Sequence, residues 1–560
     1  MTEISRRKQR LARRRKRRLR AASYASAAVI SGAAFAIVPV ETPRISTLAS
    51  AVEAGRIVPP GQAGGRFTIQ APTASASEIG ALSGAEDTGS GIPPGDLQST
   101  IDVSNELADL GFRGPNGWVD PASSGRPYGG PVDGLLTFRG NPTRSYYGEG
   151  PVPTDPQVLW SYPDDGLLCG PTTLGGGTEI WCGTGWTGQP AVWEREGRTW
   201  LAFGAFDHDV HFLDAESGEP LRPPFPTDDI IKGSVTVDPD GYPLLYTGSR
   251  DDRLHIVAFD RPEPEELWSL AATDVSPTLW NNDWDGSPLV IDDYLFEGGE
   301  NSQFHIVKLN RGYDETGNVT VDPELVFNTP GWDTELLGAH GDNVSIENSV
   351  AVAGDVVYFG NSGGLIQGWD ISGLDEGVKP ERVFRFWAGD DTDATIVIDD
   401  EGMLYVGAEY EQASARSVEV GQIIKLDPSR PNDPVVWSIP VRDRLPDGVW
   451  ATAALYRDLL VVPTHHGRLL GIDRMTGEVR WEKQLSGKTW QSPVIVDDVL
   501  IQGDCSGTLH GFDLSDTTIE PAPLWELELG GCIESTPAVW RGVIYVATRG
   551  GNFFAIGDPS

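Results

Sequence analysis

Residues 467–481 read GRLLGIDRMTGEVRW, and this stretch decides the fold. An apolar run at 469–472 ends on Asp473, and the turn-forming residues 474–477 follow it. A second short run then closes on Trp481. Turn residues between two short runs of β-forming side chains predict two strands joined by a tight turn. The next question is whether this unit recurs at a regular period.

The unit recurs along most of the chain, which indicates a repeat architecture. The copies open near Pro190, Ser234, Ser287, Ser349, Ala394, Ala451, Ser492 and Thr536. The third apolar run of each copy ends at Asp214, Asp260, Asn310, Asp370, Asp427, Asp473, Asp513 or, one residue later, Asp558. These residues suit a shared turn, because Asp and Asn side chains bond to backbone two residues on. The shorter spacings match the ~40–45 residues of a propeller blade. We therefore predict an all-β fold, an eight-bladed β-propeller.

Tryptophan marks the fourth apolar run of several copies. The residues at this position are Trp268, Trp437, Trp481 and Trp525. A large flat ring buries much apolar area, so we expect these side chains to pack between neighbouring blades. The eighth copy lacks a fourth run, whereas a matching run with Trp160 lies at 158–161. This N-terminal strand is predicted to complete the last blade and so remove exposed sheet edges. Arg139, Asn141 and Arg144, just ahead of it, are expected to clasp the domain, with ligand binding as the alternative.

Four cysteines lie in the repeat region, and their even number fits two disulfides if this region is outside the cytoplasm. Cys505 falls in the turn between the second and third strands of the seventh copy, and Cys532 in the link to the eighth. Both kinds of loop lie on one face of a propeller, so we predict that this pair bonds. Cys169 and Cys182 flank a Gly-rich turn after the closing strand and form the second predicted pair.

The N-terminal region differs from the rest in charge. Residues 1–20 hold eleven Lys or Arg and one acidic residue, about +10, which leaves about −48 on the remainder. An acidic body repels phosphate backbones, so nucleic acid is not an expected partner. Residues 21–40 are small or apolar and just long enough to cross a bilayer as a helix, with the basic flank in the cytoplasm. A cleavable signal peptide is the alternative interpretation.

Four regions follow from this pattern. We predict a basic cytoplasmic tail at 1–20, a signal anchor or signal peptide at 21–40, a flexible linker at 41–130 and the propeller at 131–560. The expected location is the cell membrane, as a single-pass protein with the propeller outside the cytoplasm. If the signal is cleaved, the protein is secreted.

The segment 471–481 resembles the tryptophan-docking motif of the PQQ-repeat (pyrroloquinoline-quinone-like) propellers, A-x-D-x-x-T-G-x-x-x-W. The residues that agree are Asp473, Thr476, Gly477 and Trp481, whereas Gly471 replaces the Ala of the motif. Partial matches extend the resemblance over about residues 157–558. The family contains quinoprotein dehydrogenases and non-catalytic members, including the propeller lipoprotein of outer-membrane protein assembly. The resemblance therefore implies the fold more firmly than an activity.

The dehydrogenases of this family bind PQQ and calcium, which the resemblance implies as candidate cofactors here. They typically carry two adjacent cysteines over the cofactor, and this chain has no Cys-Cys pair. Carboxylates and amides on the loop face could supply oxygen ligands to calcium. The candidates are Asp283, Asp285, Glu300, Asn301, Asp342 and Asn343. Trp186, Trp284 and Trp490 are candidates to stack on a flat cofactor or sugar. The competing interpretation is an ordinary polar rim with packed tryptophans.

No nucleophile–base arrangement, phosphate-binding glycine loop or HExxH motif occurs in the sequence, so no catalytic residue is assigned. We predict a non-catalytic binding or scaffolding module that binds protein, a small molecule or carbohydrate on its loop face. The first alternative is a PQQ- and calcium-dependent dehydrogenase acting on an alcohol or sugar. The second is a carbohydrate- or cell-wall-binding protein.

Overall fold

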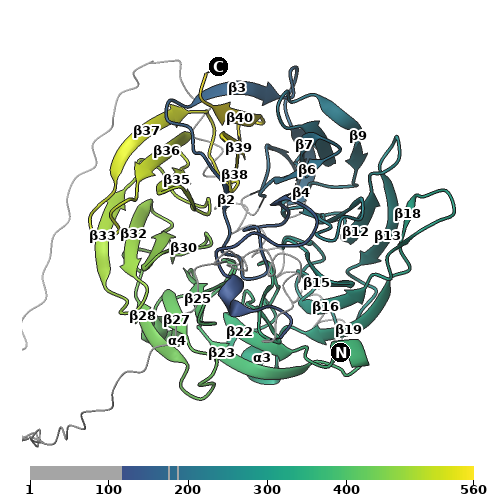
Figure 1. Ribbon diagram of the computed structural model, residues 1–560. Coiled ribbons are helices and arrows are strands. Elements are labelled where there is room, and N and C mark those ends of the chain that lie inside the picture. Colours follow the sequence, from purple (N-terminus) through teal and green to yellow (C-terminus); the bar gives the residue numbers. More distant parts are fainter. Residues whose placement is uncertain (1–116, 175–176, 186–187, 560) are drawn as a thin grey trace, which may run out of the picture. The chain divides into compact units, whose positions relative to one another are not determined.

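The computed structural model describes residues 117–174, 177–185 and 188–559, all of which belong to one compact unit. Eight blades of four strands each form a ring (Figure 1), and the sheets of two blades gain a fifth strand, from residues 134–135 or 148–149. Strands dominate this part of the chain, and its helices are short. The prediction of an all-β, eight-bladed propeller is confirmed.

The blades follow the chain in order, from the innermost strand to the outermost. Blade 1 holds β6 (Ala191–Arg195), β7 (Arg198–Gly204), β8 (Asp209–Asp214) and β9 (Pro220–Pro226). Blade 2 holds β10 (Thr236–Val237), β11 (Leu244–Gly248), β12 (Arg253–Ala258) and β13 (Glu265–Ala271). Blade 3 holds β14 (Leu289–Ile291), β15 (Tyr294–Gly298), β16 (Gln303–Lys308) and β19 (Glu324–Pro330). Blade 4 holds β20 (Ala351–Ala353), β21 (Val356–Phe359), β22 (Leu365–Asp370) and β23 (Glu381–Trp387).

The second half of the ring continues in the same way. Blade 5 holds β24 (Val397–Ile398), β25 (Leu404–Gly407), β27 (Ile423–Leu426) and β28 (Val435–Ile439). Blade 6 holds β30 (Ala454–Tyr456), β31 (Leu459–Pro463), β32 (Arg468–Asp473) and β33 (Val479–Gln484). Blade 7 holds β34 (Val494–Val496), β35 (Val499–Gly503), β36 (Thr508–Asp513) and β37 (Ala522–Glu528). Blade 8 holds β38 (Ala538–Trp540), β39 (Val543–Ala547), β40 (Phe553–Gly557) and β3 (Gln157–Tyr162).

Insertions account for the long spacings between some copies. The link from blade 3 to blade 4 contains α3 (Thr334–His340), and the extension inside blade 3 forms the hairpin β17 (Gly312–Tyr313) and β18 (Val319–Thr320). Blade 5 contains α4 (Ala415–Val420), and β26 (Glu409–Tyr410) pairs with β29 (Asp447–Gly448). The remaining elements are the hairpin β4 (Cys169–Leu174) and β5 (Gly177–Cys182) and the single turns Pro121–Ser123 and Leu374–Glu376.

A hydroxyl residue near the start of a repeat links neighbouring blades at five junctions of the described ring. The backbone N–H of Ser349 donates to Thr395 Oγ1 at 3.0 Å, and the N–H of Thr395 donates to Thr452 Oγ1 at the same distance. The same bond joins Ser287 to Ser349, Thr452 to Ser492, and Gln189 to Ser234. These groups are buried, where an unpartnered N–H is costly. The recurring Ser or Thr is therefore part of the joint between blades.

The quoted stretch forms β32, a tight turn and β33. Asp473 Oδ1 accepts hydrogen bonds from the N–H groups of Met475 at 2.9 Å and Thr476 at 2.8 Å, as the turn interpretation predicts. The same bond recurs at Asp214, Asp370, Asp427 and Asp513. At the other three repeat ends the polar residue bonds elsewhere. Asp260, for example, accepts the N–H of Val319 in the inserted hairpin at 2.6 Å.

Two of the docking tryptophans reach across to the turn of the following blade. Trp437 of blade 5 donates its Nε1–H to Arg474 O of blade 6 at 3.1 Å, and its ring lies against Gly477. Trp160 makes the same contact from blade 8 to blade 1, where its Nε1–H donates to Ala215 O at 3.3 Å and its ring covers Gly218. Tryptophan thus packs between blades at these two positions, as predicted.

The departure of Gly471 from the motif has a steric cause. The ring of Trp481 lies so close that a Cβ on Gly471 would sit 1.9 Å from it. Gly511 and Trp525 repeat this arrangement in blade 7, with a separation of 2.2 Å. Only glycine fits beneath the indole in this packing, because real Cβ atoms do not approach other heavy atoms below 3.0 Å.

The N-terminal strand completes the last blade, as predicted. β3 pairs antiparallel with β40, with Gln157 opposite Gly557. Asp558 Oδ1 accepts the N–H of Asp155 at 2.7 Å, and its other oxygen accepts the Thr154 hydroxyl at 3.2 Å. The turn between the third and fourth strands of blade 8 is therefore assembled from residues 154–155, ahead of β3, and from Asp558, after β40.

The segment ahead of β3, residues 117–150, runs through the centre of the ring, and we call it the axial segment (Figure 1). It contributes β1 (Gly134–Leu135), which pairs with β6, and β2 (Gly148–Glu149), which runs parallel to β38. It also bonds to residues in or next to the innermost strands of the other six blades: Val237, Val290, Val352, Ile398, Leu455 and Pro493. Residues 117–130 pack here too, so the packed region begins ahead of the expected linker boundary at 130.

Two buried arginines hold the axial segment to the blades. Arg144 donates to Val350 O at 2.7 Å, Phe138 O at 2.9 Å and Ser287 O at 3.1 Å. Arg139 donates to Ala453 O at 2.5 Å and also to Pro493 O. Both residues are fully buried. They clasp the domain, as expected from the sequence.

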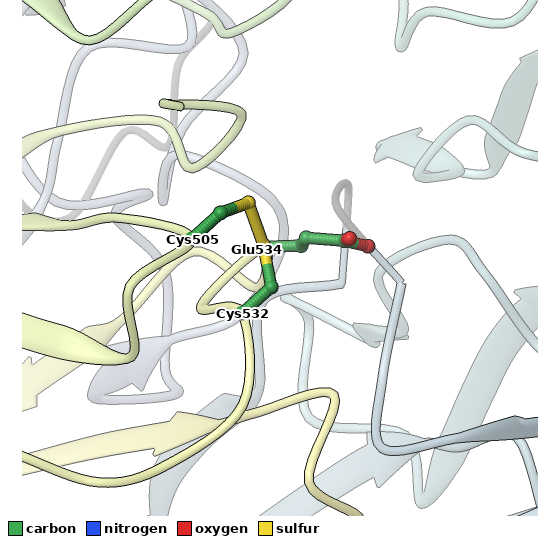
Figure 2. A group of neighbouring side chains, drawn as sticks. All are labelled: Cys505, Cys532 and Glu534. Atoms are coloured by element: carbon green, nitrogen blue, oxygen red, sulfur yellow. A yellow bond between two sulfur atoms is a disulfide. The ribbon is translucent and has the colours of Figure 1, made fainter. Parts of the chain in front are cut away.

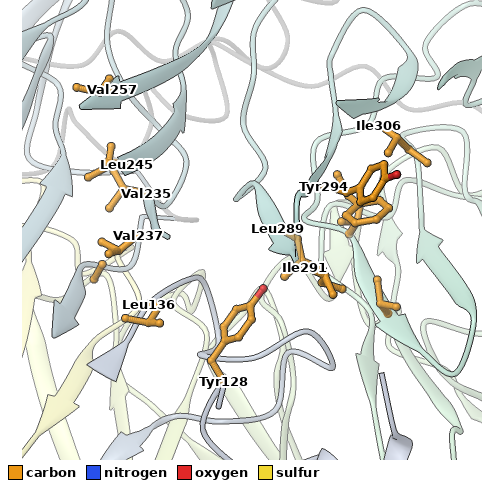
Figure 3. Close-up of a cluster of buried hydrophobic side chains, with 14 of the residues drawn as sticks. Tyr128, Leu136, Val235, Val237, Leu245, Val257, Leu289, Ile291, Tyr294 and Ile306 are labelled. Atoms are coloured by element: carbon orange, nitrogen blue, oxygen red, sulfur yellow. The ribbon is translucent and has the colours of Figure 1, made fainter. Parts of the chain in front are cut away.

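Apolar side chains of the axial segment extend the core between blades. Figure 3 shows Leu136 and Tyr128 between the apolar side chains of blade 2, such as Val237, and those of blade 3, such as Leu289 and Ile291. All five are buried, and the Tyr128 hydroxyl donates to a blade 3 carbonyl. The centre of the ring is thus packed with the chain's own residues.

The predicted tail and membrane segment, residues 1–20 and 21–40, lie outside the described residues. In the part of the chain that the structure does describe, no helix combines the length and apolar character needed to cross a membrane.

Candidate functional site

The candidate site lies where blades 2 and 3 meet, on the face formed by the links between blades and the turns between second and third strands. Lys232 comes from the link into blade 2 and forms an ion pair with Asp285, from the link into blade 3. Its ammonium also lies 3.3 Å from Glu300 Oε1, in the β15–β16 turn. Asn281 Nδ2 donates to the other Glu300 oxygen at 2.8 Å. Asp285 and Glu300 are buried.

A second ion pair joins the same two blades. The Arg250 guanidinium, in the β11–β12 turn, lies 2.7 Å from a carboxylate oxygen of Asp283 in the link into blade 3. Both side chains are largely buried. Five charged groups at this junction therefore form ion pairs across the blade boundary.

A third carboxylate completes the group that we call the acidic cluster: Asp285, Glu300 and Glu347. One carboxylate oxygen from each lies within 4.8 Å of the others. Glu347 Oε1 also accepts the hydroxyls of Ser345 at 2.6 Å and Ser362 at 2.9 Å. The cluster thus gathers side chains from the links into blades 3 and 4 and from one turn of blade 3.

Burial and the Lys232 ammonium have opposite effects on the pKa values of Asp285 and Glu300. Burial raises the pKa of Asp285 well above its ordinary value, and the nearby Lys232 offsets this only in part. Burial would also raise the pKa of Glu300, but Lys232 and hydrogen bonds from Asp285 and Asn281 lower it to about 2. Two carboxyls so close do not readily ionise together, and the ammonium of Lys232 between them opposes that repulsion.

The other metal candidates play different parts. Both ends of the Asn301 amide bond to backbone, since Oδ1 accepts the N–H of Gln303 and Nδ2 donates to Ala272 O. Asn343 is buried and Asp342 half-buried, and Asp342 is not part of the acidic cluster. The structure therefore brings together Asp283, Asp285 and Glu300 from the predicted set.

The two predicted stacking tryptophans that the structure describes, Trp284 and Trp490, are buried. Trp284 is fully buried, its ring centre 5.0 Å from that of His305. Trp490 donates its Nε1–H to His465 Nδ1 at 2.9 Å. This bond needs a neutral imidazole, and burial lowers the pKa of His465 to about 2. Trp186 lies outside the described residues.

Sequence reasoning missed Lys232 and a second group of close carboxylates, Asp391, Asp393 and Glu409, whose oxygens also lie within 4.8 Å of one another. A signal for both was present in the repeat. The position two residues ahead of the Ser or Thr at the start of the repeat is charged in blades 2 to 5, at Lys232, Asp285, Glu347 and Asp393. Aligning the copies at that hydroxyl residue would have placed Lys232 and Asp285 at equivalent positions of adjacent blades.

Both predicted disulfides are confirmed. Cys169 bonds to Cys182, and Cys505 bonds to Cys532. Figure 2 shows the Glu534 side chain extending away from the second disulfide. Glu534 is buried, which raises its pKa, and Arg549 at 3.6 Å counters that effect.

The residues at this site do not fit calcium or PQQ as the family's dehydrogenases bind them. Calcium takes six to eight oxygen ligands, whereas here an ammonium contacts two of the three clustered carboxylates. Trp284 lies against the backbone at Gly248 and Gly299, where a Cβ would collide with it or lie in tight contact. The cysteines bond over sequence separations of 13 and 27 residues, so no adjacent pair is available.

Comparisons with known proteins bear on the fold. A family model described as the outer membrane protein assembly factor BamB matches residues 419–556. The chain is similar to the quinohemoprotein alcohol dehydrogenase ADHIIG of Pseudomonas putida HK5, with 12% identity, TM-score 0.53 and coverage of 76% of this chain and 80% of that one. It is also similar to the quinohemoprotein alcohol dehydrogenase of Comamonas testosteroni, with 13% identity, TM-score 0.50 and coverage of 76% and 81%. No curated protein matched in a sequence search.

Such low identities show a common fold and leave activity open. The matched repeat, the docking motif at 473–481 and the eight closed blades agree with one another. Residues 419–556 resemble the repeats of that family model, and the described chain has the eight-bladed β-propeller fold.

Proposed function

We propose that the protein is an exported, membrane-tethered propeller that acts as a non-catalytic binding or scaffolding module. One observation supports the proposal. The chain's own side chains and backbone occupy the centre of the ring and the candidate site, where a cofactor would bind. The axial segment bonds to all eight blades, and Lys232 and Arg250 neutralise carboxylates at the candidate site. What remains for a partner is the outer surface of the loop face.

Export is part of the proposal. Two disulfides support an oxidising compartment, because they are rare in the cytosol. The basic tail and the apolar stretch of residues 21–40 support a single-pass anchor. Carbonate-washed membranes should retain the full chain, and protease added to intact spheroplasts should digest the propeller. Recovery of the shortened protein from the medium would indicate a cleaved signal instead.

Reconstitution tests the non-catalytic part. The purified chain is incubated with PQQ and CaCl2, and then assayed by absorbance and by dye-linked oxidation of alcohols and sugars. We expect neither stoichiometric PQQ binding nor turnover, because the candidate site lacks open oxygen ligands. Stoichiometric binding with turnover would replace the scaffold proposal with the dehydrogenase. Retention on cell-wall polysaccharide would favour the carbohydrate-binding alternative.

A further inference from the structure

The acidic cluster has the dimensions of a site for one metal ion. Calcium–oxygen distances of about 2.4 Å allow two ligands of the same ion to be at most about 4.8 Å apart. The oxygens of Asp285, Glu300 and Glu347 lie within that separation. Buried carboxylates at this spacing repel one another and need a positive charge among them.

The positive charge comes from the chain itself. Lys232 Nζ contacts Asp285 and Glu300, and its side chain is only 13% exposed. Asn281 holds the far oxygen of Glu300, and two serine hydroxyls hold Glu347. Arg250 is engaged separately by Asp283. Lys232 is therefore the cation in contact with the cluster.

We propose that the Lys232 ammonium is the resident cation of the acidic cluster, so that the cluster is complete without a divalent metal and becomes a divalent-cation site only when Lys232 is removed. The arrangement also has a mechanical role. Lys232 belongs to blade 2, whereas Asp285 and Glu300 belong to blade 3, so the ion pairs fasten two adjacent blades. A metal would need ligands from the same places, and the ammonium replaces it without dependence on calcium supply.

The test compares the wild-type chain with Lys232→Met in EDTA and in about 1 mM CaCl2, at equal ionic strength. For the wild type we expect the same melting temperature in both. Lys232→Met leaves buried carboxylates without their cation and should melt at least about 5 °C lower in EDTA. Calcium should recover most of that loss, and calorimetric titration should show one calcium site in the variant alone.

Two variants make the result specific. Lys425→Met removes another buried lysine, which lies 4.0 Å from Asp399, and should be destabilised without rescue by calcium. Lys232→Met/Asp285→Asn removes one charge of each sign, and should melt close to the wild type and respond weakly to calcium. If Lys232→Met fails to fold in EDTA, its folded yield with and without CaCl2 gives the same readout.

Three outcomes would overturn the proposal. The first is calcium stabilisation of the wild type that Asp285→Asn abolishes. The second is a folded Lys232→Met that ignores calcium. The third is equal calcium rescue of Lys232→Met and Lys425→Met, which would show an effect of calcium unrelated to the cluster. None of these readouts depends on activity, so they are separate from the reconstitution that tests the proposed function.

Discussion

At the scale of single residues, the docking contact joins one blade to the next through an indole and a glycine. Gly477 adopts φ of +76°, and the ring of Trp437 lies so close that a Cβ would come within 2.8 Å of it. Glycine is therefore required at this position for two reasons: the backbone is left-handed, and the ring of Trp437 leaves no room for a Cβ. Gly218 and Trp160 repeat both features at the ring closure, which shows that the requirement belongs to the repeat.

Comparing Gly477→Ala with a control glycine should separate the cost of the left-handed backbone from the cost of displacing the indole. The left-handed conformation costs an alanine about 1 kcal/mol, and displacement of the indole should add about 1–3 kcal/mol. Gly197→Ala is the matched control, because Gly197 has φ of +73° and no atom within 4 Å of its would-be Cβ. Urea denaturation of both variants measures the difference. If both variants lose the same stability, the close contact with the indole adds nothing to the cost of the Gly477→Ala substitution.

Some residue-level features could be predicted from the sequence, and others could not. The Asp473 turn and the cysteine pairing were predictable, because both follow from local pattern and loop position. Lys232 was not found, because a lysine next to a carboxylate can be recognised only once blades 2 and 3 are placed side by side. Asn301 was misleading for the opposite reason: an amide in a turn looks like a ligand, yet backbone groups satisfy it.

At the scale of elements, the axial segment is the least regular part of the fold and one of the most connected. It contains only the two-residue strands β1 and β2, and still bonds to every blade. Its polar side chains turn inward, and Arg144 alone donates to three backbone carbonyls. Burial lowers the pKa of Arg144 to about 10, which still leaves the guanidinium charged at neutral pH.

Arg144→Met tests this element. The substitution keeps an apolar stem but leaves Val350 O, Phe138 O and Ser287 O without their donor, and should cost about 3 kcal/mol or more. Arg198→Met is the control, since Arg198 is 62% exposed and its pair with Asp214 should be worth less than about 1 kcal/mol. Guanidinium denaturation followed by tryptophan fluorescence gives both values. If Arg144→Met loses no more stability than Arg198→Met, the hydrogen bonds of Arg144 do not stabilise the fold.

The axial segment was also the element that sequence analysis described least well. The blades could be predicted, because alternating apolar residues, turns and tryptophans recur at a measurable period. The axial segment has no period, since each of its residues meets a different blade. Its composition resembles that of a linker, and the expected linker accordingly extended to residue 130, beyond Gly117 and Trp118, which already contact the blade 4 turn and the core.

At the scale of the whole molecule, the two disulfides stabilise the region where the ring closes. Cys505–Cys532 ties the turn of blade 7 to the link into blade 8, and Cys169–Cys182 pins the hairpin that follows β3. Both therefore act near the junction between the last blade and its neighbours.

Cys505→Ser/Cys532→Ser should reduce stability by about 3 kcal/mol, because the bond closes a loop of 27 residues in the unfolded chain. Thermal unfolding with and without dithiothreitol checks this. Once reduced, the wild type should become as labile as a variant in which all four cysteines are changed to serine, and that variant should not respond to the reductant. A wild type indifferent to reductant would contradict the predicted stabilising role.

The ring closure has a consequence for the order in which the molecule can be assembled. Asp155 and Asp558 bond to each other across 403 positions of the chain. At about 5–20 residues per second, a ribosome needs roughly 20–80 s to add that length. During this time β3 and the axial segment have left the ribosome, whereas their partners in β40 and β38 do not yet exist. The first part of the propeller to be synthesised is therefore among the last to fold, and the incomplete propeller must be kept from aggregating until blade 8 has been synthesised.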